Sequence, residues 1–555
     1  MKRIKILFVL LLTVSYTVCA QKDVEPLLFR AMNDELKRSM DSLSLPEMQK
    51  PFYLAYTVKR CKGYEIRSSY GAIMSATDGD IYCKNNFRVD MYVGNYHRCN
   101  IMASLTGMLA YFLDQSGELP DDLDYSETRR LLWQATDNLY KKVATDYEKK
   151  MSALKQMNLS PETEAVDDYA KISPIEKKVP HRIQFKSNRR AYWEKTLNAV
   201  SSVFTEYPDI IDCDVRISVN SADIYFLSSE GSKVVNSQDF SSLFIRASTR
   251  TEEGDEISSG IGYSELDEAL FPSQDSLIRA AKNVVLKIYA LKNAPKVNET
   301  YYGPVLFDNC LELIKLFLDY RTGLTAYKAY QADNEGKSLE NLMNRRILPS
   351  NINIISEPGL KEFQGKQLWG TYEVDAEGVV PPDTFILVEK GMLRNVLNGR
   401  FATLKTPLSN GHNIATAESS GAKMDLGPGV LRVDVTDGGE TKAQLKEKLI
   451  RLAIEEGLDY AYIVRKGLFY KVNVNDESEQ LVRGLTTQTI TVQMMKRMAG
   501  ISSDQILSNN IHSSVLNSLI YPSSILLEDI EVSKDGIRYN QKTPLVTSPL
   551  FDKKK

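Results

Sequence analysis

Apolar residues recur at helical spacing in several stretches of the chain. Residues 24–44 carry leucine and methionine at three- and four-residue steps, which predicts an amphipathic helix. Shorter helices are predicted at residues 190–205, after the capping residue Ser273, and after Thr441, which has capping-box spacing to Gln444. A long helix is expected in between, because one apolar stripe continues through Leu132, Ala135, Leu139, Val143, Tyr147, Met151 and Leu154.

Between these helices, aromatic and β-branched residues predict strands. Three runs at residues 52–59, 64–76 and 81–93 fit this pattern, and Asp78-Gly79 predicts a hairpin between the second and third runs. Further strands are expected at residues 214–219, 222–228, 243–250, 352–356, 384–388, 430–435 and 461–465.

The order of these elements predicts an α+β fold. We expect an N-terminal domain of helices and antiparallel sheet over residues 21–298, with a helical excursion at about residues 119–205. A mostly β C-terminal domain is expected over residues 299–555. The polar, proline-containing stretch from Asn293 to Thr300 marks the predicted boundary between the two.

The N-terminal residues predict the cellular location of the protein. Basic residues, a short apolar run and small residues before a cut after Ala20 predict a signal peptide over residues 1–20. We therefore expect an exported protein, periplasmic or secreted, with no transmembrane segment after cleavage. A lipid anchor at Cys19 is not expected, because bulky Val18 and Tyr16 precede it where small residues and leucine are usual.

Composition argues against some partners and some chemistry. The 69 basic and 72 acidic residues give a net charge of −3, so no overall positive field favours nucleic acid. The lysines of the long predicted helix, Lys149 and Lys150 among them, are interspersed with acidic residues and are expected to lie mostly on a solvated face. The chain has only four histidines, which limits metal or acid–base chemistry that depends on imidazole.

The cysteines leave the disulfide pattern open. Those that follow the predicted signal peptide are Cys61, Cys83, Cys99, Cys213 and Cys310. Because their number is odd, at least one is unpaired within the chain. A bridge among the first three is one interpretation, and buried free thiols are the other.

Several motifs follow one another in an order typical of one family. They are YFLSSEG at residues 225–231, GTYEVDAEG at 370–378, TFILVEKGMLR at 384–394, SNGH at 409–412 and LVRG at 481–484. This order resembles the TldD/PmbA family of modulator-of-gyrase-type peptidases, and residues 128–137 resemble its exported branch. The resemblance implies an α+β N-terminal domain and a mostly β C-terminal domain. It also implies paired subunits that enclose a cavity and cleave peptides, with zinc in only one type of subunit.

The zinc motif of that family is not found at the matching position. The family's zinc helix reads H-E-x-x-x-H, and the corresponding residues here are Asp308, Asn309 and Leu313. A leucine side chain has no lone pair for a metal, and an asparagine cannot act as the general base that activates water. The family's further ligand near the C-terminus is not matched by a cysteine, because none follows Cys310. The resemblance therefore implies the zinc-less type of subunit.

These observations predict a function related to peptide proteolysis, with no catalytic residue, metal ligand or cofactor assigned to this chain. The first hypothesis is a zinc-less subunit or a peptide-binding homologue, paired with a zinc-bearing TldD-like subunit or with itself. The alternatives are a non-enzymatic envelope or peptide-binding module and an active metallopeptidase with a different metal site. Asn410 and His412 are the candidate substrate-binding residues, and a polar turn after Pro407 is the other interpretation of their loop.

Overall fold

The computed structural model describes most of the chain. The described residues are 24–78, 85–101, 114–156, 161–185, 187–318, 324, 342–417, 422–512 and 514–535. The predicted signal peptide, Gly79 of the predicted hairpin and Cys83 lie outside them. Below, the N-terminal part means the described residues up to 298, and the C-terminal part means those from 299.

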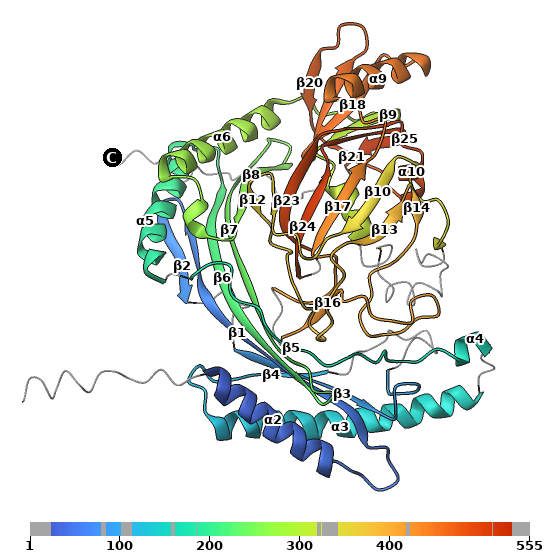
Figure 1. Ribbon diagram of the computed structural model, residues 1–555. Helices are drawn as coiled ribbons and strands as arrows, with labels where there is room; N and C mark the ends of the chain where they lie inside the picture. The colour runs from blue at the N-terminus through green and yellow to red at the C-terminus, as the bar shows by residue number, and fades with distance from the viewer. Residues whose placement is uncertain are drawn as a thin grey trace, which may run out of the picture.

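An eight-stranded sheet forms the centre of the N-terminal part (Figure 1). The strand order is β4-β3-β1-β6-β7-β5, with β2 also paired to β1 and β8 also paired to β7. All pairs are antiparallel except β5 with β7. The strands are β1 (Pro51–Ser69), β2 (Ala72–Asp78), β3 (Asn86–Val93), β4 (Asp114–Glu118), β5 (Glu176–Lys178), β6 (Asp212–Ser228), β7 (Lys233–Arg250) and β8 (Glu256–Glu265).

Helices cover one face of this curved sheet (Figure 1). Two of them, α2 (Val24–Ser42) and α3 (Tyr125–Gln156), pack on β1 and β3 at one end. The other two, α5 (Arg190–Ser201) and α6 (Gln274–Asn293), pack further along on β1, β7 and β8. A short helix, α4 (Pro161–Glu164), follows α3. No helix in the described part of the chain is long and apolar enough to cross a bilayer.

The side chains of β1 alternate between the two faces of the sheet. They show which face the helices cover and which face contacts the C-terminal part. Leu54 and Tyr56 are buried beneath α2 and α3. Tyr53 and Lys59 point the other way, and the Lys59 ammonium donates to the backbone carbonyl of Thr416 at 2.7 Å. The C-terminal part therefore packs on the face of the sheet opposite the helices.

The C-terminal part is built mainly from two sheets that enclose one apolar core. The first has six strands in the order β14 (Met392–Leu393), β13 (Phe385–Glu389), β10 (Ile352–Ser356), β17 (Val430–Val435), β24 (Val515–Pro522) and β23 (Gln505–His512). The second has β20 (Glu479–Val482), β19 (Leu468–Asn473), β18 (Tyr460–Arg465), β9 (Tyr301–Asp308), β25 (Ser524–Lys534) and β21 (Leu485–Thr487), with β22 (Gly500–Ile501) also on β25.

Short elements complete this part. They are the two-stranded sheets β11 (Glu362–Phe363) with β12 (Lys366–Gln367) and β15 (Asn413–Ala415) with β16 (Met424–Leu426), and the helices α7 (Leu311–Lys315), α9 (Lys442–Glu455) and α10 (Val492–Lys496). Helix α9 covers the second sheet through Leu445 and Leu449. Its N-terminus has the predicted capping box, in which Thr441 and Gln444 each bind the other's backbone N–H.

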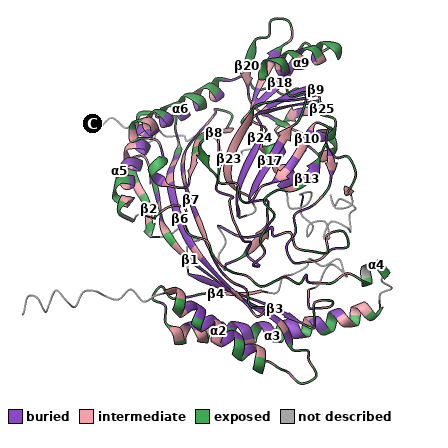
Figure 2. Cartoon of the chain, in the orientation of Figure 1, coloured by how far each residue is buried: buried purple, intermediate pink, exposed green. Residues whose placement is uncertain are grey.

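This architecture confirms the predicted α+β class, with helices and a sheet followed by a mostly β part. The long helix is confirmed as α3, and the strands predicted at residues 352–356 and 430–435 are β10 and β17. Figure 2 shows the burial that underlies the sequence pattern: the strands are mostly buried, whereas the helices bury one side and expose the other.

Two strand predictions were wrong in detail. The predicted hairpin at Asp78-Gly79 does not join an antiparallel pair, because β2 and β3 both run antiparallel to β1 along the same edge. The turn lies earlier, at Tyr70-Gly71, where both residues have positive φ angles of 48° and 80° and Ser69 pairs with Ala72. Similarly, residues 212–228 form one continuous strand, β6, rather than two.

One lysine departs from the predicted solvated face of α3. The Lys150 side chain is only 2% exposed, and its ammonium donates to the Ile101 carbonyl at 2.5 Å and to Asp168 Oδ2 at 2.6 Å. Lys149, its neighbour in sequence, is 65% exposed, as expected. The buried lysine is accommodated because a carboxylate and a carbonyl from other segments replace its water.

Candidate functional site

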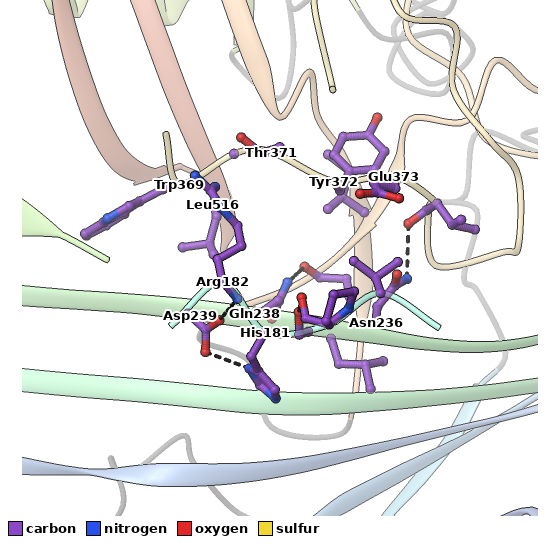
Figure 3. A pocket seen from close by; sticks show the side chains of 18 of the residues that line it. His181, Arg182, Asn236, Gln238, Asp239, Trp369, Thr371, Tyr372, Glu373 and Leu516 are labelled. Atoms are coloured by element: carbon purple, nitrogen blue, oxygen red, sulfur yellow. Dashed lines mark hydrogen bonds and ion pairs between the residues drawn. The ribbon is translucent and has the colours of Figure 1, made fainter. Parts of the chain in front are cut away.

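A cleft of about 140 Å³ lies where the N-terminal sheet meets the C-terminal part (Figure 3). One wall comes from residues 236–239 of β7 and from the segment 179–182 that follows β5. The opposite wall comes from the loop 369–374 and from Ile414 and Ala415 of β15. Ile224, Leu266, Lys361, Ala376 and Leu516 complete the lining.

The strand lengths explain why an opening exists here. β7 is 18 residues long, but β8 pairs only with its residues 241–250 and β5 only with residues 233–235. Residues 236–240 of β7 therefore have no strand beside them on that edge among the described residues. This gap in the sheet edge faces the C-terminal loops and forms the cleft.

A charged cluster centred on His181 occupies one side of the cleft. His181 Nδ1 lies 2.8 Å from Asp239 Oδ1, and His181 Nε2 lies 2.9 Å from Asp223 Oδ1. Hydrogen bonds that His181 donates to Asp223 and Asp239 raise its pKa to about 9. Ser221 also donates to Asp239 Oδ1, at 2.8 Å. The imidazole is therefore protonated near neutral pH, so it cannot act as the general base that a Ser/His/Asp triad requires.

Arg182 connects this cluster to the C-terminal part by hydrogen bonds. Its backbone N–H donates to Asp239 Oδ2 at 3.2 Å, and its guanidinium donates to the carbonyls of Leu368 and Lys361 at 2.5 and 2.9 Å. Since Leu368 precedes Trp369 in the opposite wall, Arg182 fixes the distance between the two walls. Figure 3 shows Arg182 and His181 on the same side of the opening.

The rest of the lining mixes apolar residues with Ser237, Lys361, Thr371 and Glu373, and two amide side chains in it bind backbone carbonyls. Asn236 donates to Val374 at 3.1 Å, and Gln238 donates to Ala415 at 2.7 Å. The carbonyl oxygen of the Gln238 side chain and the indole N–H of Trp369 are both buried with no hydrogen-bond partner among the described residues. A buried acceptor and a buried donor without partners are unusual in folded proteins. Both residues line the cleft, so the two unpartnered atoms belong to its walls.

The structure places the predicted residues Asn410 and His412 behind the wall of this cleft. His412 is fully buried, its Nδ1 lies 2.8 Å from the Asn410 carbonyl oxygen, and its Nε2 lies 2.9 Å from Ser356 Oγ. Tyr372 connects this loop to the cleft, because it lines the opening and its hydroxyl donates to the Gly411 carbonyl at 2.8 Å. Ile414 and Ala415, two and three residues after His412, are the part of the loop that faces the opening. Substrate binding by Asn410 and His412 stays a prediction.

The residues matched to the family's zinc helix lie elsewhere, at the end of β9. The Asp308 carboxylate is held by Lys442 at 2.8 Å, Arg465 at 3.4 Å and Ser524 at 3.3 Å. Asn309 accepts from the Tyr521 hydroxyl, and Leu313 is buried in the C-terminal core. A zinc ion does not fit this donor set, because the one carboxylate is already neutralised by two cations.

No group of three or more His, Cys, Asp or Glu side chains in the described ranges is arranged to hold a metal. Three of the cysteines, Cys99, Cys213 and Cys310, are buried free thiols. Burial raises the pKa of Cys99 and of Cys310 to about 12, so neither is a reactive thiolate near neutral pH.

Sequence reasoning did not identify the residues of the cleft. His181 stood alone between Pro180 and Arg182, and no motif linked it to Asp223 or Asp239. The one available signal was an aspartate, Asp223, inside a strand run of otherwise apolar residues. The contacts that make the site join distant segments: the two His181 pairs are 42 and 58 residues apart, and Gln238 and Ala415 in the opposite walls are 177 residues apart.

Comparisons with known proteins identify the fold. Residues 304–534 match the PmbA/TldA metallopeptidase C-terminal domain. A search of curated proteins found no match. Three solved structures share the fold over nearly their whole length at low sequence identity.

The first is a proposed modulator of a DNA gyrase from Thermotoga maritima, with 14% identity, a TM-score of 0.53, and coverage of 86% of this chain and 96% of that one. The second is TldE from Thermococcus kodakarensis, with 13% identity, a TM-score of 0.55, and coverage of 91% and 100%. The third is a proposed modulator of DNA gyrase from Bacteroides thetaiotaomicron, with 12% identity, a TM-score of 0.56, and coverage of 93% and 100%. Residues 304–534 therefore form a PmbA/TldA metallopeptidase C-terminal domain, and the chain as a whole shares the fold of TldE.

Proposed function

We propose that this protein binds peptides in the cleft between its N-terminal sheet and its C-terminal part, and that it does not itself hold the zinc of the family. The observation that carries the proposal is the pair of buried, unpartnered polar atoms on residues that line the cleft, the Gln238 side-chain oxygen and the Trp369 indole nitrogen. A peptide group has one acceptor and one donor, and its side chains suit the apolar lining. The relation of the C-terminal domain to metallopeptidases supports a peptide as the ligand.

The zinc-less state rests on the residues at the end of β9. Asp308 is engaged by Lys442 and Arg465, and Leu313 offers no metal ligand. Hydrolysis of a bound peptide would then need a partner subunit that carries zinc. Export to the periplasm or to the medium, pairing with such a subunit or with itself, and the lack of a nucleic-acid partner stay predictions from the sequence.

A binding experiment tests the proposal. The probe is a fluorescein-labelled peptide of alternating threonine and valine with a lysine at each end, and binding is read by fluorescence anisotropy. Ala415 is half-buried in the wall of the cleft, so Ala415→Phe should fill the opening and weaken binding at least tenfold. Ala415→Ser is the matched control and should bind as the wild type does. Equal affinity of all three proteins would contradict a site in this cleft.

Metal analysis of the purified chain tests the second half of the proposal. We expect well below one zinc per chain after dialysis. We also expect the protein to leave the probe peptide intact with or without added zinc, as measured by chromatography. Stoichiometric zinc that survives dialysis, together with cleavage of the probe, would favour the alternative of an active metallopeptidase with a different metal site.

A further inference from the structure

Helices α5 and α6 lie side by side on the N-terminal sheet and form part of its outer layer (Figure 1). At one end, Trp193 of α5 packs edge-on against Phe271, three residues before α6, with 5.8 Å between the ring centres. At the other end, Tyr207 lies beside Tyr289 of α6, with 6.2 Å between the ring centres. The chain therefore runs the same way along both helices, and their outward sides form one surface.

The spacing of residues along α6 shows which side chains point outward. The residues that pack on the sheet are buried and recur every three or four positions. Between them, the exposed residues lie on the opposite side of the helix (Figure 2). The exposed residues of the two helices that define what is here called the α5–α6 surface are Tyr192, Lys195, Arg279, Lys282, Leu286 and Lys287.

The four cations of the α5–α6 surface have no carboxylate partner among the described residues. Arg279 donates to the Ser276 hydroxyl at 2.8 Å, and the ion pairs of these two helices involve other residues, such as Lys292 with Asp209. The one acidic residue of α6 is Asp275, in its first turn. The surface therefore keeps its positive charge, in a protein whose net charge is −3.

Helix α9 shows the alternative arrangement. It also carries four basic residues, and each of them is paired with a carboxylate. The pairs are Lys442 with Asp308, Lys446 with Glu479, Lys448 with Glu440 and Arg451 with Glu455. The cations of α9 are thus neutralised within the chain, whereas those of the α5–α6 surface are left for an anion outside it.

Apolar side chains stand among the unpaired cations. Leu286 is 63% exposed and lies between Lys282 and Lys287 on the outward side of α6, and Tyr192 of α5 is 45% exposed. Cations around exposed leucine and aromatic side chains are typical of helices that lie in the headgroup region of a bilayer. There the apolar side chains enter the edge of the acyl layer and the cations meet the lipid phosphates.

We propose that the α5–α6 surface binds an anionic phospholipid membrane, with Leu286 and Tyr192 inserted among the headgroups. Complementarity of charge identifies this partner, because lipid phosphates supply the anions that the four cations lack. Nucleic acid is anionic too, but it offers no apolar layer to Leu286. None of the residues that line the cleft belongs to this surface, so the inference does not depend on the proposed function.

Co-sedimentation with lipid vesicles tests the inference. The probes are vesicles of phosphatidylcholine alone and vesicles of equal parts phosphatidylcholine and phosphatidylglycerol. We expect the purified chain to sediment with the anionic vesicles and not with the neutral ones, and binding to weaken as salt screens the charges. No binding to the anionic vesicles, or equal binding to both kinds, would overturn the inference.

Variants locate the binding surface. Lys282→Gln/Lys287→Gln should lower the binding constant for anionic vesicles at least tenfold, since each cation held near an anionic bilayer adds to the affinity. Lys446→Gln/Arg451→Gln makes the same change of charge on α9 and should bind as the wild type does. Circular dichroism and thermal unfolding verify that both doubles are folded. An equal loss in the two doubles would mean that only net charge matters, and the inference would be wrong.

A change of the apolar residue separates lipid from other polyanions. Leu286→Gln should also weaken vesicle binding, whereas Ile454→Gln, at a residue of α9 that is 56% exposed, should not. Vesicle binding that Leu286→Gln leaves unchanged, together with binding of duplex DNA that Lys282→Gln/Lys287→Gln abolishes, would replace the membrane with nucleic acid. Ala415→Phe should bind vesicles as the wild type does, so this inference and the proposed function can fail separately.

Discussion

Arg400 and Glu230 form a bidentate ion pair that joins the two parts of the molecule. Arg400 Nη1 lies 2.7 Å from Glu230 Oε2, and Arg400 Nη2 lies 2.7 Å from Glu230 Oε1. The guanidinium also lies 4.1 Å from the ring centre of Tyr169 and donates to the Ala170 carbonyl. Glu230 belongs to the turn between β6 and β7, so this pair anchors that turn against the C-terminal part.

We expect Arg400→Met to be strongly destabilising. The Arg400 side chain is fully buried and Glu230 is 11% exposed, so the substitution leaves a carboxylate without its partner in a mostly dry site. Removing one member of a buried pair costs about 3–5 kcal/mol of unfolding free energy. Urea unfolding followed by circular dichroism measures this loss. Arg394→Met is the control, because Arg394 and Glu389 are 40% and 47% exposed and such a pair contributes at most about 1 kcal/mol. Equal losses would show that the Arg400 pair is as accessible to water as the Arg394 pair.

The neighbours Lys149 and Lys150 allow a second matched comparison. Lys150→Met leaves Asp168 without its closest cation and should cost about 3–5 kcal/mol. Lys149→Met removes an exposed pair with Asp146 and should change stability by no more than about 1 kcal/mol. Chemical unfolding of both variants under the same conditions decides the point. Similar effects from the two substitutions would mean that water reaches Lys150 in solution.

Lys150 also shows what a periodic pattern can and cannot predict. The apolar stripe predicted α3 correctly, because the residues that repeat every three or four positions are the ones that become buried. Lys150 is three residues after Tyr147 and therefore lies on that stripe. Its burial depends on Asp168 and on the Ile101 carbonyl, which belong to segments outside the helix. Local spacing carries no information about such partners.

The same limit explains the errors in the sheet and the missed cleft. The stretch from Lys59 to Lys62 separated two predicted strands, yet β1 continues through it because β6 pairs with β1 along this whole stretch. The cleft depends on how far β8 and β5 extend along β7, which is a matter of register between distant segments. Sequence alone therefore predicted the fold class and the resemblance that the match of residues 304–534 supports, whereas the site required the arrangement of strands in space.

His412 should make the protein sensitive to acid. Burial lowers the pKa of His412 to about 3, whereas an unfolded histidine titrates near 6.5. Below about pH 6.5 the unfolded chain thus gains a proton that the folded protein does not, and this group lowers the unfolding free energy by about 1.4 kcal/mol per pH unit as the pH falls toward 3. We expect urea midpoints to fall more steeply between pH 7 and 4.5 in the wild type than in His412→Gln. Parallel curves would show that the imidazole is accessible to protons in the folded protein.

His181 should behave in the opposite way. Its hydrogen bonds to Asp223 and Asp239 raise its pKa to about 9, so the folded protein holds a proton that the unfolded chain releases near pH 6.5. The stability that His181 contributes is fully present below about pH 6.5 and is lost as the pH rises through 9. Histidine NMR measures the titration directly, and we expect one imidazole with a midpoint near 9 that is missing in His181→Gln. Asp223→Asn removes one of the two carboxylates and should move that midpoint downward. A wild-type midpoint near 6.5 would mean that the charged wall of the cleft is not formed in solution, and that the ligand meets a neutral imidazole there.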